Sequence, residues 1–221
     1  MTLTGAVESF DVTIPANGGR NQPLMLPGRL ALPAPPVGLV LFAHGSGSSR
    51  HSPRNVFVAS VLHESWIGTL LFDLLSEHEA TDRVNVFDVA LLAERLVAAI
   101  RFVGTLEHTR HLPLGLFGAS TGAAAALVAA ATEPNVGAIV SRGGRPDLAG
   151  RKLRMVRAPT LLVVGATDTD VLALNREALR KLECEKQLAV VPEAGHLFEE
   201  PGTLAEASRL ATEWFTRHLH E

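Results

Sequence analysis

The segment Gly118-Ala119-Ser120-Thr121-Gly122 is the sharpest chemical signal in the chain. It follows the apolar run from Leu112 to Phe117 and precedes an alanine-rich segment with helical character. In a tight turn from a strand to a helix, flanking glycines leave room to lift a serine hydroxyl to the end of the sheet. The pattern therefore predicts a nucleophile at Ser120. By itself it is equally compatible with a helix cap at a glycine-rich turn.

Asp168 is the candidate for the acid that would accompany this serine. It comes shortly after the apolar run from Thr160 to Val164, which is typical of a buried strand. A carboxylate at the carboxyl end of a strand can reach over the edge of the sheet. Alternatively, it caps the helix expected to begin near Val171, and Asp170 competes for either role. Asp168 is preferred because it lies closer to the strand.

His196 is the candidate general base, on a loop after the apolar run from Leu188 to Val191. The chain has nine histidines, so one loop histidine alone proves little. However, Ser120, Asp168 and His196 occur in the order nucleophile, acid, base, and each follows an apolar strand. The carboxyl ends of parallel strands meet at one edge of a sheet, which predicts that the three side chains meet there.

A glycine-rich turn, His44-Gly45-Ser46-Gly47, follows the first core strand. Such a turn can aim a backbone N–H group at the negative charge that develops on a carbonyl oxygen during acyl transfer. The backbone N–H groups of Ser46 and Thr121 are the predicted oxyanion hole. The alternative for this segment is a flexible turn without a chemical role.

Two residues are candidates for contact with substrate. Leu75 lies on the loop after the strand that ends at Phe72 and is expected to rim the pocket. Arg142 follows the strand predicted from Val136 to Val140, and it either binds an acidic group of the substrate or pairs with a carboxylate such as Asp147. A further basic cluster, formed by Arg50, His51 and Arg54, is interpreted as the start of a helix rather than as a set of substrate ligands.

The elements that must position these residues follow from hydrophobic patterning. From residue 37 onward, short and unbroken apolar runs alternate with segments of helical period, which indicates a mostly parallel sheet covered by helices on both faces. We expect an α/β fold with about eight strands. Ser52 before Pro53 predicts one helix start, and Thr203 with Glu206 predicts a capping box at another.

The first 36 residues alternate in the manner of strands, with a turn signal at Asn17-Gly18-Gly19 and an interruption at Pro27-Gly28. They are too few for a core of their own. We expect an antiparallel hairpin over residues 1–36, packed on the core of a single domain that spans residues 1–221.

Composition excludes several classes of protein. Twenty basic and 23 acidic residues give a net charge of −3, which does not favour a nucleic-acid partner. We expect no membrane span, no signal peptide and a cytoplasmic location, because no apolar run is long enough and the first residues lack a leader pattern. No cluster of His, Cys and carboxylates at ligand spacing suggests a metal, and no phosphate-binding loop suggests a nucleotide cofactor. Oligomeric state is not readable.

With these residues in view, the chain resembles the α/β-hydrolase superfamily, and within it the small dienelactone hydrolase-like group that has no lid domain. The resemblance rests on His44 to Gly47, Gly118 to Gly122, Asp168 and Gly195-His196. It implies a catalytic triad of Ser120, His196 and Asp168. Dienelactone hydrolases are known for a cysteine nucleophile, whereas this chain has Ser120, so the dienelactone substrate does not carry over.

The serine points instead to hydrolysis of small carboxylic esters or lactones through an acyl-enzyme, without a cofactor. A thioesterase or acyltransferase with the same triad remains an alternative. From a different class, the domain could be a ligand-binding or accessory module that keeps the pocket but turns over little.

Overall fold

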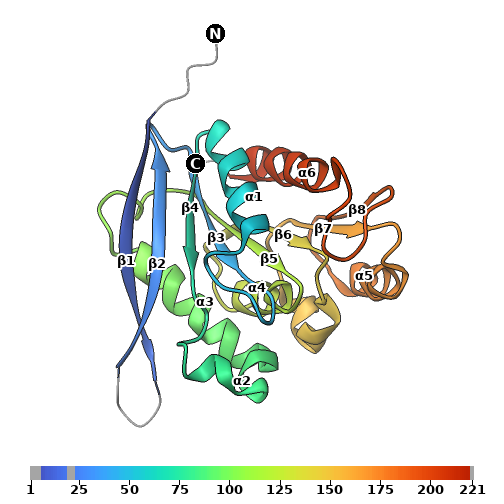
Figure 1. Cartoon of the computed structure of the whole chain (residues 1–221), viewed down its shortest axis with the longest axis horizontal. Helices are drawn as coiled ribbons and strands as arrows, with labels where there is room; N and C mark the ends of the chain where they lie inside the picture. The colour runs from blue at the N-terminus through green and yellow to red at the C-terminus, as the bar shows by residue number, and fades with distance from the viewer. Residues whose placement is uncertain (1–5, 19–22, 220–221) are drawn as a thin grey trace.

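The computed structural model describes residues 6–18 and 23–219, and within them eight strands form one sheet in the order β1-β2-β4-β3-β5-β6-β7-β8 (Figure 1). Neighbouring strands from β4 to β8 are parallel, whereas β2 is antiparallel to both of its neighbours. The strands are β1 (Val7–Asn17), β2 (Pro23–Pro33), β3 (Gly38–Ala43), β4 (Ile67–Phe72), β5 (Leu114–Ala119), β6 (Val136–Arg142), β7 (Thr160–Gly165) and β8 (Lys186–Val191). The predicted fold class is confirmed.

The central strands are apolar on both sides because helices cover both faces of the sheet. Every residue of β3, β4, β5 and β7 is buried, as expected for parallel strands that lie between two layers of helices. At one edge, β8 begins with exposed Lys186. The loops that follow β3, β5, β7 and β8 all leave the same edge of the sheet, where the predicted reactive residues lie.

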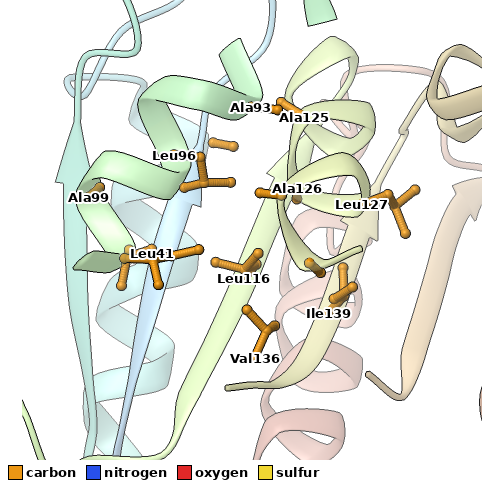
Figure 2. Close-up of a cluster of buried hydrophobic side chains, with 14 of the residues drawn as sticks. Leu41, Ala93, Leu96, Ala99, Leu116, Ala125, Ala126, Leu127, Val136 and Ile139 are labelled. Atoms are coloured by element: carbon orange, nitrogen blue, oxygen red, sulfur yellow. The ribbon is translucent and has the colours of Figure 1, made fainter. Parts of the chain in front are cut away.

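The helices form two layers, one on each face of the sheet (Figure 1). Helices α1 and α6 pack on one face with Val40, Phe42 and Phe117. Helices α3 and α4 pack on the other face, where Figure 2 shows their side chains meeting Leu41, Leu116 and Ile139. The helices are α1 (Pro53–Glu64), η1 (Glu79–Thr81), α2 (Arg83–Phe87), α3 (Val89–Val103), α4 (Thr121–Ala130), η2 (Pro146–Met155), α5 (Thr169–Lys181) and α6 (Thr203–His218). None of the helices in these described ranges is long and apolar enough to cross a membrane.

The N-terminal hairpin is an edge of the main sheet, because β2 pairs directly with β4. Pro27 and Gly28 do not interrupt it, and β2 runs through both. Gly28 is required there, since a Cβ atom would lie 2.9 Å from the Cβ of Phe72. The predicted turn at Asn17-Gly18-Gly19 extends beyond the described residues at its last position.

Two predicted helix starts have different outcomes. The Ser52 side chain accepts a hydrogen bond from the N–H of Asn55 and caps α1, as predicted. The capping box of Thr203 and Glu206 is wrong. Gly202, in a left-handed conformation, occupies the cap position of α6, and the Thr203 hydroxyl donates to the carbonyl of Glu200 instead.

Candidate functional site

Ser120 lies at a strained turn between β5 and α4. Its backbone adopts φ 51° and ψ −122°, a region that non-glycine residues rarely occupy and that costs of the order of 1–3 kcal/mol. Three backbone hydrogen bonds hold it there. The Ser120 N–H donates to the carbonyl of Arg142, and its own carbonyl accepts from Ala123 and Arg145. This is the geometry of a nucleophile elbow, and the serine does not cap α4 with its side chain.

The glycines around this turn permit close approach of three segments. A Cβ atom at Gly122 would lie 2.1 Å from the carbonyl oxygen of Ala43 and 2.5 Å from that of His44. The first turn of α4 therefore packs directly on the backbone at the end of β3, which places the Ser46 turn beside the Ser120 turn.

Gly122→Ala is therefore expected to destabilise the protein by about 1–3 kcal/mol, because backbone atoms cannot move aside as a flexible side chain can. Urea unfolding measures the loss. Gly137→Ala is the matched control, since its Cβ would make an ordinary 3.4 Å contact with the Leu219 side chain. Equal stability of the two variants would contradict the close approach at Gly122.

Asp168 and His196 are joined directly, with Asp168 Oδ2 2.7 Å from His196 Nδ1. Asp168 occupies the cap position of α5, where a carboxylate normally accepts from the helix N–H groups, yet its side chain makes no cap hydrogen bond. Its carboxylate serves the imidazole instead, while Asp170 is exposed in the first turn of α5. Ser120 lines the same cavity as His196. Among the hydrogen bonds of the described residues, none joins the Ser120 hydroxyl to the imidazole.

The loops that carry Asp168 and His196 are tied to each other. The carbonyl of Ala194 accepts two hydrogen bonds from Thr167, one from its N–H at 3.0 Å and one from its hydroxyl at 2.8 Å. Phe198, only 2% exposed, anchors the far side of the His196 loop in the core. The distance between acid and base is thus set by backbone contacts and by packing.

The predicted oxyanion residues are neighbours in the structure. The Ser46 N–H donates to the Thr121 hydroxyl at 3.0 Å, so the N–H that was predicted to face substrate has an internal acceptor. His44 fixes this turn from behind, because its Nε2 accepts from the Leu74 N–H and its Nδ1 lies 3.1 Å from the carbonyl of Gly45. Burial lowers the pKa of His44, so the ring is neutral and can accept from Leu74.

A cavity of about 240 Å³ opens over Ser120 and His196, and a second of about 300 Å³ adjoins the same turn, since Gly45, Ser46 and Ser48 line both. Leu75, predicted to rim the pocket, is buried and lines the second cavity together with Val86. Arg142 lines the first cavity with Ser120. The structure therefore places the two substrate candidates in different cavities, which share the residues of the Ser46 turn.

Arg142 is the most unusual residue of the site. The alternative that it pairs with Asp147 is wrong, because Arg145 binds that carboxylate with two hydrogen bonds of 2.9 and 2.8 Å. The side chain of Arg142 lies over the ring of Phe198, with 5.7 Å between the guanidinium carbon and the ring centroid. Burial, and secondly the nearby Arg54 guanidinium, lower the pKa of Arg142 to about 10, which leaves it charged at neutral pH.

Sequence reasoning missed Arg54 as a residue of the site. Arg54 lies in the first turn of α1 and also lines the Ser120 cavity. The other members of the basic cluster have separate roles, since Arg50 pairs with Asp73 and His51 is exposed. The position of Arg54 in the helix that follows the glycine-rich turn was the available signal. The sequence did not predict which side of α1 faces the cavity.

Comparison with known proteins gives the family. The dienelactone hydrolase family model matches residues 76–219. A dienelactone hydrolase structure from Anabaena variabilis is 49% identical with a TM-score of 0.89, covering 96% of this chain and 99% of that one. The esterase domain of a Rhodothermus marinus protein, 22% identical with a TM-score of 0.75 over 96% and 99% of the two chains, supports the fold alone.

A Mycobacterium tuberculosis protein named as a phosphoribosyl transferase is 56% identical over 198 residues, which are 89% of this chain and 45% of that protein. This chain spans less than half of that relative, so the name describes a longer protein. The family model and the Anabaena relative both describe the segment that is present. The chain belongs to the dienelactone hydrolase family, and it has the α/β-hydrolase fold.

Proposed function

We propose that the protein hydrolyses small carboxylic esters or lactones, with Ser120 as nucleophile, His196 as general base and Asp168 as the acid that orients the base. The observation that carries the proposal is the 2.7 Å contact between Asp168 and His196, at the sheet edge where the strained Ser120 turn faces the same cavity. A serine hydroxyl is a weak nucleophile at neutral pH and needs such a base.

In the proposed reaction, His196 takes the proton of the Ser120 hydroxyl as the oxygen attacks the ester carbonyl. The Asp168 carboxylate holds the imidazole and stabilises the imidazolium that forms. Collapse of the tetrahedral intermediate breaks the ester bond, and His196 returns the proton to the departing alcohol. Water then repeats the cycle on the acyl-enzyme and releases the acid.

Charge on the tetrahedral oxygen would be held by backbone N–H groups at Thr121 and Ser46. Thr121 is the first residue of α4, where N–H groups have no partner within the helix. The Ser46 N–H already has a polar acceptor in the Thr121 hydroxyl, which keeps this donor oriented. The oxyanion would share or replace that acceptor.

The test is intact-mass analysis after reaction with a fluorophosphonate probe. We expect one adduct on the wild type and none on Ser120→Ala. Ser60→Ala is the matched control, because Ser60 is an exposed serine of α1 and should leave the adduct in place. An adduct that persists in Ser120→Ala would assign the nucleophile elsewhere. A folded wild type without any adduct would favour a ligand-binding module.

A further inference from the structure

The cavity over Ser120 is lined by two cationic side chains, and one of them, Arg142, has no carboxylate partner in the part of the chain that the structure describes. Two of its lining residues are arginines, Arg54 and Arg142, and no carboxylate is among the described residues that line it. Arg142 is 7% exposed. Its Nε and Nη1 have no hydrogen-bond partner, and its Nη2 lies 3.4 Å from the Asn55 side-chain oxygen. That contact is longer than a typical hydrogen bond, so Asn55 satisfies the guanidinium only weakly.

Without a bound anion, this arrangement lowers the stability of the folded protein. A buried cation without a paired anion and with unmade hydrogen bonds destabilises the folded state. Elsewhere in the chain, arginines find partners, as Arg145 does with Asp147 and Arg209 with Glu206. The fold therefore keeps an unpaired guanidinium beside the reactive serine, although a neutral side chain of similar length would fill the same volume.

The surroundings reinforce the positive potential. The cavity is flanked by the first turns of α1 and α4, through Ser52 and Ser120, and helix N-termini attract anions. The side chain of Arg54 is one third exposed and makes a 3.3 Å ion pair with Glu199, which is 66% exposed. That exposed pair at the rim is worth little, so Arg54 also remains available to an anion.

We propose that the substrate of this hydrolase carries an anionic group, a carboxylate or a phosphate, and that Arg142 is the specificity-determining residue that binds it beside the ester. The inference rests on the proposed ester hydrolysis at Ser120. The anion lies within a few bonds of the scissile carbonyl, because Arg142 and Ser120 line one cavity of about 240 Å³. Arg142 takes no part in the bond changes. It favours anionic substrates because their charge supplies the partner that the Arg142 guanidinium lacks within the described part of the protein.

The experiment compares esters that differ only in charge. For the alcohol side, the acetate esters are methyl 4-acetoxybenzoate, 4-acetoxybenzoate and 4-acetoxyphenyl phosphate, which separate a neutral, a carboxylate and a phosphate group. For the acyl side, 4-nitrophenyl hexanoate is compared with the mono-4-nitrophenyl ester of adipic acid. We expect kcat/KM of the wild type to be about 10- to 100-fold higher for at least one anionic ester than for its neutral partner. This is the factor that one hydrogen bond to a charged group typically contributes.

Arg142→Met is expected to abolish that preference, because methionine is unbranched, uncharged and adapts to the vacated space. Arg142→Lys keeps the charge and should retain part of the preference. Fluorophosphonate labelling of Ser120 should remain in both variants, which separates a specificity role from a structural one. A labelled wild type without preference for any anionic ester, or a preference that survives in Arg142→Met, would overturn the proposal and leave Arg142 as packing on Phe198.

Binding is measured independently of turnover. We expect 4-hydroxybenzoate or phenyl phosphate to raise the Tm of the wild type and of Ser120→Ala, but not that of Arg142→Met. Absence of labelling together with this Tm shift would reject the esterase and keep the anion site. Labelling without any Tm shift and without charge preference would reject the anion site and keep the esterase.

Discussion

His196→Ala is expected to lower kcat for a small ester by roughly 10⁵- to 10⁶-fold, because the serine then has no base and the leaving alcohol has no acid. Steady-state kinetics with 4-nitrophenyl acetate measure the loss. KM should change far less, since the imidazole acts mainly in the transition state. His108→Ala is the control, because His108 is exposed on a different loop and should leave kcat unchanged within about twofold.

The exposure of His196 adds a second measurement. Its side chain is 40% exposed, so the space that alanine leaves is open to solvent. Added imidazole is expected to restore part of the activity of His196→Ala and none of that of Ser120→Ala. Full activity of His196→Ala without imidazole would assign the base to another residue.

Asp168→Asn is expected to lower kcat by about 10⁴-fold, because an amide cannot stabilise the imidazolium and favours the wrong tautomer of His196. Asp170→Asn is the matched control, two positions away and exposed at the start of α5. It should change kcat by no more than about twofold. A larger loss in Asp170→Asn than in Asp168→Asn would exchange the roles of the two carboxylates.

The strand positions could be predicted from the sequence because the burial of a strand on both faces is visible in its own residues. Strands covered on both faces are continuously apolar, so β5 and β7 begin and end within two residues of the predicted runs. The predicted run for β8 lacks the first two residues of the strand, because at the edge of the sheet Lys186 and Gln187 face solvent and do not look like a buried strand. Hydrophobicity therefore locates these strands to within two residues, at the edge of the sheet as in its interior.

The relation between Asp168 and His196 was also predictable, since chain order and the parallel sheet bring both loops to one edge. Contacts that side chains make with groups far apart from them in the sequence were not predictable. The Ser46 N–H and the Thr121 hydroxyl are 75 residues apart in sequence, and no local pattern links them. The pairing of Arg145 with Asp147 was missed for a different reason. Two arginines compete for one carboxylate, and only the direction of the chain after β6 decides between them.

The order of the strands has a consequence for how the chain acquires its chemistry as it folds. The Ser120 turn follows β5, but the acid and the base follow β7 and β8, at the other end of the sheet from the hairpin. Long-range pairings form more slowly than local ones. A folding intermediate that had assembled only through β6 would contain the serine turn and a helix behind it, yet it would have neither acid nor base. Catalytic competence, as proposed for this site, is thus a property of the completed sheet.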